Sequence, residues 1–96
     1  HNFRISIINM KVLELRNLQR EEGQIFYLRK YTCVIAIEFP TGIELLDIKF
    51  NIETSPLGTK NVELILLSEV NYPLLSVRRA ILEFLLVEEQ EGRLPC

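Results

Sequence analysis

The chain has 96 residues, of which 48% are hydrophobic and 25% charged, so it is long enough for one domain with a modest core. This composition excludes a disordered or fibrous protein. The formal net charge of −2, from 11 basic and 13 acidic residues, gives no general attraction to nucleic acid or to anionic lipid. Binding to either would therefore need a local patch of positive charge.

Four segments have the composition and turn boundaries of strands, and one later segment has the period of a helix. The expected strands span residues 3–18, 25–39, 43–53 and 61–67, and the expected helix spans 73–90. Pro73 suits the first helical position, and Gly92 suits the end. The sequence therefore predicts a single α+β domain over residues 1–96: a four-stranded antiparallel meander with one C-terminal helix on one face.

Matching apolar and charged side chains across the second hairpin predicts its register. A two-residue turn at 41–42 sets Ile35 against Ile48 and Lys30 against Glu53, which leaves one face of the hairpin apolar. The same matching in the other two hairpins sets Phe50 against Leu64 and Val12 against Cys33. The reverse face of the sheet would then carry a second apolar set: Leu13, Leu15, Val34, Ala36, Leu45, Ile65 and Leu67.

The helix has two apolar stripes. The broad one should cover the sheet, and it comprises Leu74, Val77, Ala80, Ile81, Phe84, Leu85 and Val87. We expect Phe50 and Phe84 to be buried between sheet and helix. A narrower stripe of Leu75, Leu82 and Leu86 lies to one side and is a candidate interface, unless the loop 68–72 or the first strand covers it.

Residues for catalysis are lacking. His1 is the only histidine and lies at the start of the chain, the cysteines have no CxxC spacing, and the glycines form no phosphate-binding motif. The acidic run at 88–91 opposes the helix dipole and should fray. We therefore expect a protein that is not an enzyme and that has no cofactor or metal site.

The cysteines and the hydropathy pattern bear on location. Cys33 lies in an apolar strand and Cys96 at the last position, so we expect two reduced thiols, with Cys33 in the core. The sequence has no apolar run long enough to span a membrane and does not begin like a signal peptide. The expected location is the cytoplasm.

A mixture of cations and aromatic rings near the tip of the first hairpin allows a nucleic-acid alternative. The candidate contacts are Arg16, Arg20, Arg29, Lys30 and Tyr27. Acidic residues at 14, 21 and 22 lie among these cations and cancel most of their field, which disfavours nucleic acid. The alternative is a solvated arm or one that reaches a partner protein.

Surplus apolar surface predicts a protein-protein interaction or assembly module, forming a homo-oligomer or binding a partner protein. A four-stranded meander followed by a helix, with "PLLSVRRAILEFL" before "GRLP", also resembles the SecB-like export chaperones over part of the chain. That resemblance implies a third possibility, a chaperone-like binder of apolar segments.

Overall fold

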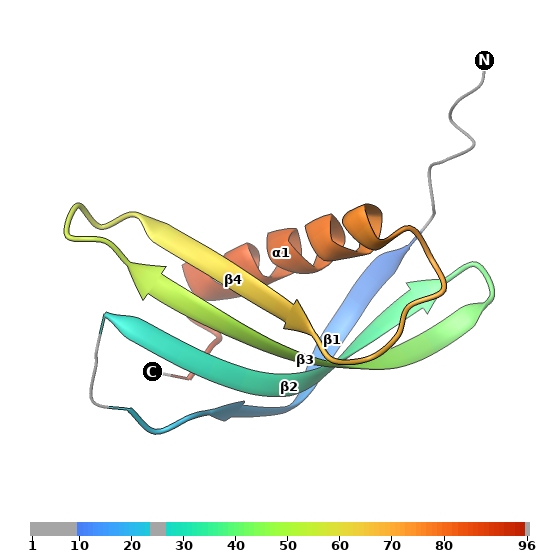
Figure 1. Ribbon diagram of the computed structural model, residues 1–96, viewed down its shortest axis with the longest axis horizontal. Coiled ribbons are helices and arrows are strands. Elements are labelled where there is room, and N and C mark those ends of the chain that lie inside the picture. Colours follow the sequence, from blue (N-terminus) through green and yellow to red (C-terminus); the bar gives the residue numbers. More distant parts are fainter. Residues whose placement is uncertain (1–9, 24–26, 96) are drawn as a thin grey trace, which may run out of the picture.

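The computed structural model describes residues 10–23 and 27–95, and it confirms the predicted α+β architecture. The elements are β1 (Lys11–Arg20), β2 (Leu28–Phe39), β3 (Gly42–Thr54), β4 (Lys60–Leu66) and α1 (Leu74–Gln90). The strands form one antiparallel sheet in the order β1-β2-β3-β4, with α1 following β4 (Figure 1). The beginning of the predicted first strand, residues 3–9, lies outside the described residues, as do 24–26.

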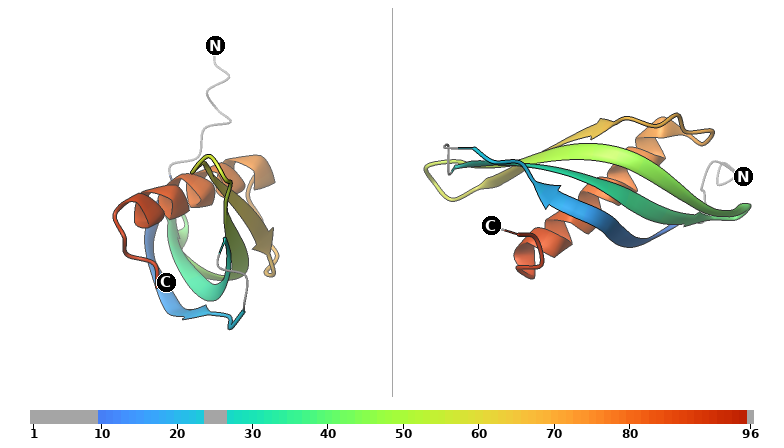
Figure 2. Two further views of the ribbon diagram at one scale, coloured as in Figure 1. Left: turned by 90° about the vertical axis from the view of Figure 1, so that its left-hand side faces the viewer. Right: turned by 90° about the horizontal axis from the view of Figure 1, so that it is seen from below.

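The sheet curves into a trough, and α1 lies obliquely across the open side (Figure 2). The helix contacts the two outer strands, β1 and β4, so it bridges the rims of the trough. Because α1 lies over the mouth rather than flat on a sheet, only its innermost side chains are covered on both sides. Its buried residues are Val77, Ile81 and Leu85, which recur every four positions along one narrow stripe.

The core fills this trough. Alternate residues of β2 and β3 face inward, and the largest fully buried side chains include Tyr31 and Phe50, which stack with ring centroids 4.8 Å apart. The prediction that Phe50 is buried is confirmed. Phe84 is only half-buried, and Leu74 and Val87 are exposed, so the broad helical stripe was predicted too wide.

The predicted register of the second hairpin is wrong by two residues. Cys33 pairs with Ile48, and Lys30 pairs with Asn51 rather than with Glu53. The turn lies at Pro40 and Thr41, where proline's fixed φ favours the second position of a turn and its missing N–H breaks no ladder. A shift of two positions leaves every side chain on the same face, so apolar matching could not detect the error.

The third hairpin has the predicted register, with Phe50 opposite Leu64, whereas the first does not. Val12 pairs with Ile37 rather than with Cys33, and the β1–β2 ladder is irregular at two places, between Val12 and Glu14 and between Arg16 and Gln19. Each irregularity changes which residues of β1 face the trough. Leu15 consequently packs against the core and not on the reverse face, contrary to the prediction.

The helix ends in a Schellman motif that directs the chain back under the sheet. Gly92 has φ of +71°, its N–H donates to the carbonyl of Glu89, and the N–H of Arg93 donates to the carbonyl of Glu88. At the other end of α1, Pro73 is the N-cap and not the first helical residue. After the motif Leu94 is buried in the core, so the acidic end of α1 is anchored and not frayed.

Candidate functional site

The cations of the first hairpin are split between the two faces of the sheet. Arg29 points into the trough, whereas Lys30 is exposed on the convex face, because neighbouring residues of a strand alternate. Arg16 is exposed and pairs with Glu14, with 2.5 Å between Arg16 Nε and Glu14 Oε2. Tyr27 is exposed at the start of β2. The predicted tip residues therefore do not form one binding surface.

Arg29 takes part in a cluster that joins three elements. Its Nη2 donates to Glu89 Oε2 of α1 at 2.6 Å, and its Nη1 donates to the Tyr31 hydroxyl at 2.8 Å. Lys60 of β4 approaches the same carboxylate at 3.2 Å. Burial by itself raises the pKa of Glu89, but hydrogen bonds from Arg29 and Lys60 outweigh it and hold the pKa below its usual value.

Tyr31 links this cluster to the segment that follows α1. Its hydroxyl donates to the carbonyl of Pro95 and accepts from Arg29. Burial raises the pKa of Tyr31, so the phenol stays protonated and keeps donating. The cluster thus ties β2, β4 and the end of the chain's helical segment together, and its chemistry is that of a structural tie.

Arg20 lies opposite Tyr31 in the β1–β2 ladder, on the same side of the sheet as Arg29. Its Nε is buried and has no hydrogen-bond partner among residues 10–23 and 27–95. Of the predicted tip residues, the structure therefore brings together only Arg20 and Arg29. Both are directed inward, half-buried, and away from the surface where a nucleic acid would lie.

The described residues hold no arrangement suited to metal binding or nucleophilic catalysis. None of their His, Cys, Asp and Glu side chains form a group of three or more that could hold a metal ion. Burial raises the pKa of the Cys33 thiol to about 11, so it is inert near neutral pH. A pocket of about 850 Å³ lies between the start of β2 and the β3–β4 turn, lined by one carboxylate, Glu53, among hydroxyl and amide side chains.

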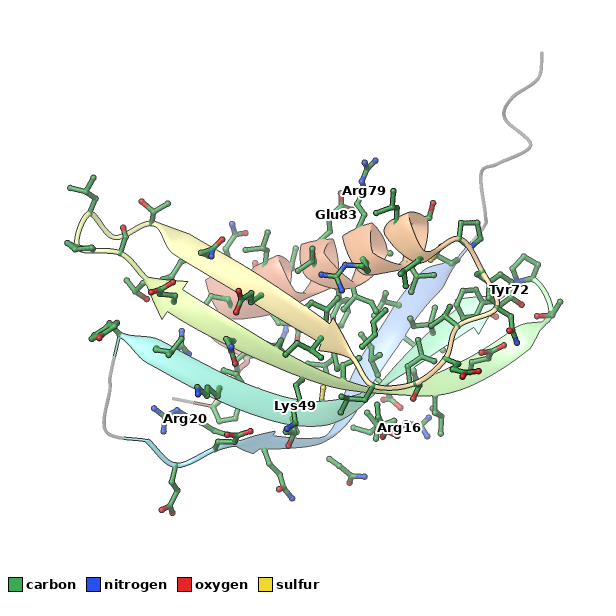
Figure 3. All side chains as sticks on the ribbon, viewed as in Figure 1. Arg16, Arg20, Lys49, Tyr72, Arg79 and Glu83 are labelled. Atoms are coloured by element: carbon green, nitrogen blue, oxygen red, sulfur yellow. The ribbon has the colours of Figure 1, made fainter. Side chains whose placement is uncertain are left out.

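The outer face of α1, defined here by Leu75, Arg79, Glu83 and Leu86, points away from the sheet. Arg79 and Glu83 project outward in Figure 3, and Leu75 is 81% exposed and Leu86 37% exposed. The third predicted interface residue, Leu82, is half-buried and packs against the core cluster. The predicted leucine stripe therefore lies at the surface with one side in the core.

The loop at 68–72 does not cover this outer face. Its Tyr72 stacks on Phe39, with ring centroids 3.9 Å apart, and contacts Thr41 through its hydroxyl. The loop thus closes the far end of the trough, over the β2–β3 turn. Of the two intramolecular covers considered for the leucine stripe, the loop is excluded by this placement.

A second apolar area lies on the convex face of the sheet. Its exposed members are Ile43, Leu45, Ile65 and Leu67. Charges lie among them, because Lys49 is the cross-strand partner of Ile65 and Asp47 accepts a backbone hydrogen bond from Leu67. This face is therefore a mixed surface rather than a continuous apolar patch.

A protein-family model matches residues 7–87, which covers most of the chain. The chain belongs to the BB_0187 family. Membership in this family implies no particular reaction, ligand or partner by name, so the function is argued from the geometry. No curated protein matches the chain, and no solved structure matches it.

Within the described ranges, the one long helix of this family member is not apolar enough to cross a membrane. Two features of the helix were missed by reasoning from the sequence. Glu89 was placed in a fraying acidic run, although its position four residues after Leu85 puts it near the buried stripe. Arg79 was passed over, although it completes a repeating spacing with the three leucines.

Proposed function

We propose that this protein is an assembly module that associates with other protein through the outer face of α1. The observation that carries the proposal is the exposure of Leu75, at 81%, beside Leu86 on a helix whose opposite face is fully buried. Apolar side chains gathered on one side of a small domain commonly mark interfaces, and association adds buried surface that a short chain lacks.

The outer face of α1 has stronger support than the convex face of the sheet. Its leucines follow one ridge of a single rigid helix, whereas each apolar residue considered on the sheet has a charged neighbour across the strands. Binding through the sheet would have to desolvate Asp47 and Lys49. The geometry supports the nucleic-acid alternative less, because carboxylates already neutralise Arg16 and Arg29.

The test replaces the two exposed leucines together, as Leu75→Glu with Leu86→Glu. We expect the wild-type chain to have a mass above that of the monomer in light scattering, and the double variant to have the monomer mass with an unchanged circular-dichroism spectrum, because unpaired charges resist burial. Leu82 is left intact because it packs against the core.

Leu45→Glu is the matched control, since Leu45 is 52% exposed on the other side of the molecule. It should leave the association unchanged. A wild-type chain that stays monomeric at high concentration would overturn the proposal. Dissociation by Leu45→Glu, with no effect of the helix variant, would instead place the interface on the sheet.

A further inference from the structure

The outer face of α1 has the spacing of a coiled-coil seam. Leu75, Arg79, Leu82 and Leu86 follow one another at intervals of four, three and four residues. Residues at this spacing line one side of a helix and meet a second helix by knobs-into-holes packing. Three of the four positions are leucine, and the fourth is an arginine.

Arg79 restricts how a second copy of this helix could lie. In a parallel pair each seam residue faces its own counterpart, so Arg79 would face Arg79 of the other copy inside the contact. In an antiparallel pair with two-fold symmetry, Leu75 faces Leu86 of the other copy and Arg79 lies beside Leu82 of the other copy. The residue after Leu82 is Glu83, which also projects outward (Figure 3).

The antiparallel arrangement therefore pairs opposite charges twice. Within the part of the chain that the structure describes, neither Arg79 nor Glu83 has an ion-pair partner. Two-fold symmetry makes the contact isologous, so one Arg79–Glu83 pair forms on each side of the axis. Arginine at such a position can lay its aliphatic stem on leucine and direct its guanidinium to the carboxylate.

We infer that the partner bound by the outer face of α1 is a second copy of this chain, with the two helices antiparallel and Arg79 of each copy paired with Glu83 of the other. This inference rests on the proposed assembly function and specifies its partner and orientation. A contact made by one helix from each copy is smaller than the roughly 1,200–2,000 Å² buried in stable complexes. The dimer is therefore weak, and its population rises with concentration.

The experiment uses complementary charge reversals on separate chains. Arg79→Glu alone sets Glu against Glu83, and Glu83→Arg alone sets Arg against Arg79, so each variant should weaken its own dimer about tenfold or more. Mixing the two variants creates opposite charges at both contacts, and the mixture should form heterodimers with about the wild-type dissociation constant. Sedimentation equilibrium, with one variant fluorescently labelled, measures all three.

Mixing also separates the inference from an effect within one helix. Residues 79 and 83 are four apart, so each reversal also places like charges on the same helix and weakens it slightly. That effect is unchanged by mixing, whereas a contact between copies is restored. Lys49→Glu, which makes the same change in net charge on the convex face, is the control and should leave the dimer unaffected.

The outcomes distinguish this inference from the proposed function. If Leu75→Glu with Leu86→Glu dissociates the protein but the charge variants keep the wild-type dissociation constant, the assembly function stands and the antiparallel pairing is wrong. If each charge variant weakens the dimer but mixing restores nothing, the pairing is likewise overturned. A wild-type chain that is monomeric throughout overturns both.

Discussion

Arg29 of β2 and Glu89 of α1 meet at 2.6 Å although 60 positions separate them in the sequence. Each side chain is only 13% exposed, and Lys60 joins the same carboxylate from β4. One carboxylate therefore ties the C-terminal end of the helix to a central strand and an edge strand. It also explains why an acidic helix end, unfavourable for the helix dipole, is held in place.

Replacing Glu89 should be costly because it leaves Arg29 half-buried without its counter-charge. We expect Glu89→Gln to lower the free energy of unfolding by about 1 to 3 kcal/mol, between the values for exposed and buried pairs. Urea denaturation measures the change. Glu91→Gln is the control, since Glu91 is exposed and lies 4.0 Å from Arg93, and it should change little.

The same carboxylate should make stability depend on pH. The pKa of Glu89 in the folded protein lies below its usual value of 4.5, because hydrogen bonds and charges from Arg29 and Lys60 outweigh the effect of burial. Its ionised form thus stabilises the fold fully above pH 4.5 and loses this contribution as pH falls through the folded pKa. Glu89→Gln should therefore lose less stability on acidification than wild type. An equal loss in both proteins would contradict the pairing.

Cys33 should be unreactive in the folded protein. With a pKa of about 11, roughly one thiol in a thousand is ionised at pH 8, and the thiol is buried as well. In a Cys96→Ser background we expect no reaction with a thiol-specific reagent under native conditions and one equivalent after denaturation in urea. Rapid labelling of the native variant would show that the centre of β2 opens.

The Schellman motif predicts different effects of alanine at two glycines. Gly92→Ala should cost about 1 to 2 kcal/mol, because Gly92 has φ of +71°, where a Cβ atom is strained. Thermal unfolding followed by circular dichroism measures the loss. Gly23 does not have a positive φ, and nothing lies within 4 Å of an added Cβ. Gly23→Ala should therefore leave the melting temperature nearly unchanged, and equal effects would argue against the motif.

Phe50 and Phe84 should differ in their contributions to stability. Phe50 is fully buried and stacked on Tyr31, so Phe50→Ala should cost about 3 to 5 kcal/mol, which is enough to unfold much of a domain of this size. Phe84 is half-buried beside β1, so Phe84→Ala should cost about 1 to 2 kcal/mol. Chemical denaturation ranks the two variants, and the reverse order would mean that the helix is rotated.

The sequence by itself determined the element types, their order and the inward face of β2 and β3. These follow from the period of the apolar residues, which is local information. It could not determine the register of the second hairpin, because a two-residue shift preserves each face and only the position of Pro40 in the turn decides between the two. In β1 the apolar spacing of three in Val12, Leu15 and Leu18 indicated irregular pairing, but no strict alternation accommodates it.

Only the tertiary structure decided the roles of individual charges and leucines. Sequence placed Arg16, Arg20, Arg29 and Lys30 in one group, yet strand alternation and the curve of the sheet direct Arg29 to Glu89 and leave Lys30 on the convex face. Likewise a helical wheel cannot say how much of α1 a curved sheet covers. Because α1 spans the mouth of a trough, Leu82 touches the core while Leu75 remains in solvent.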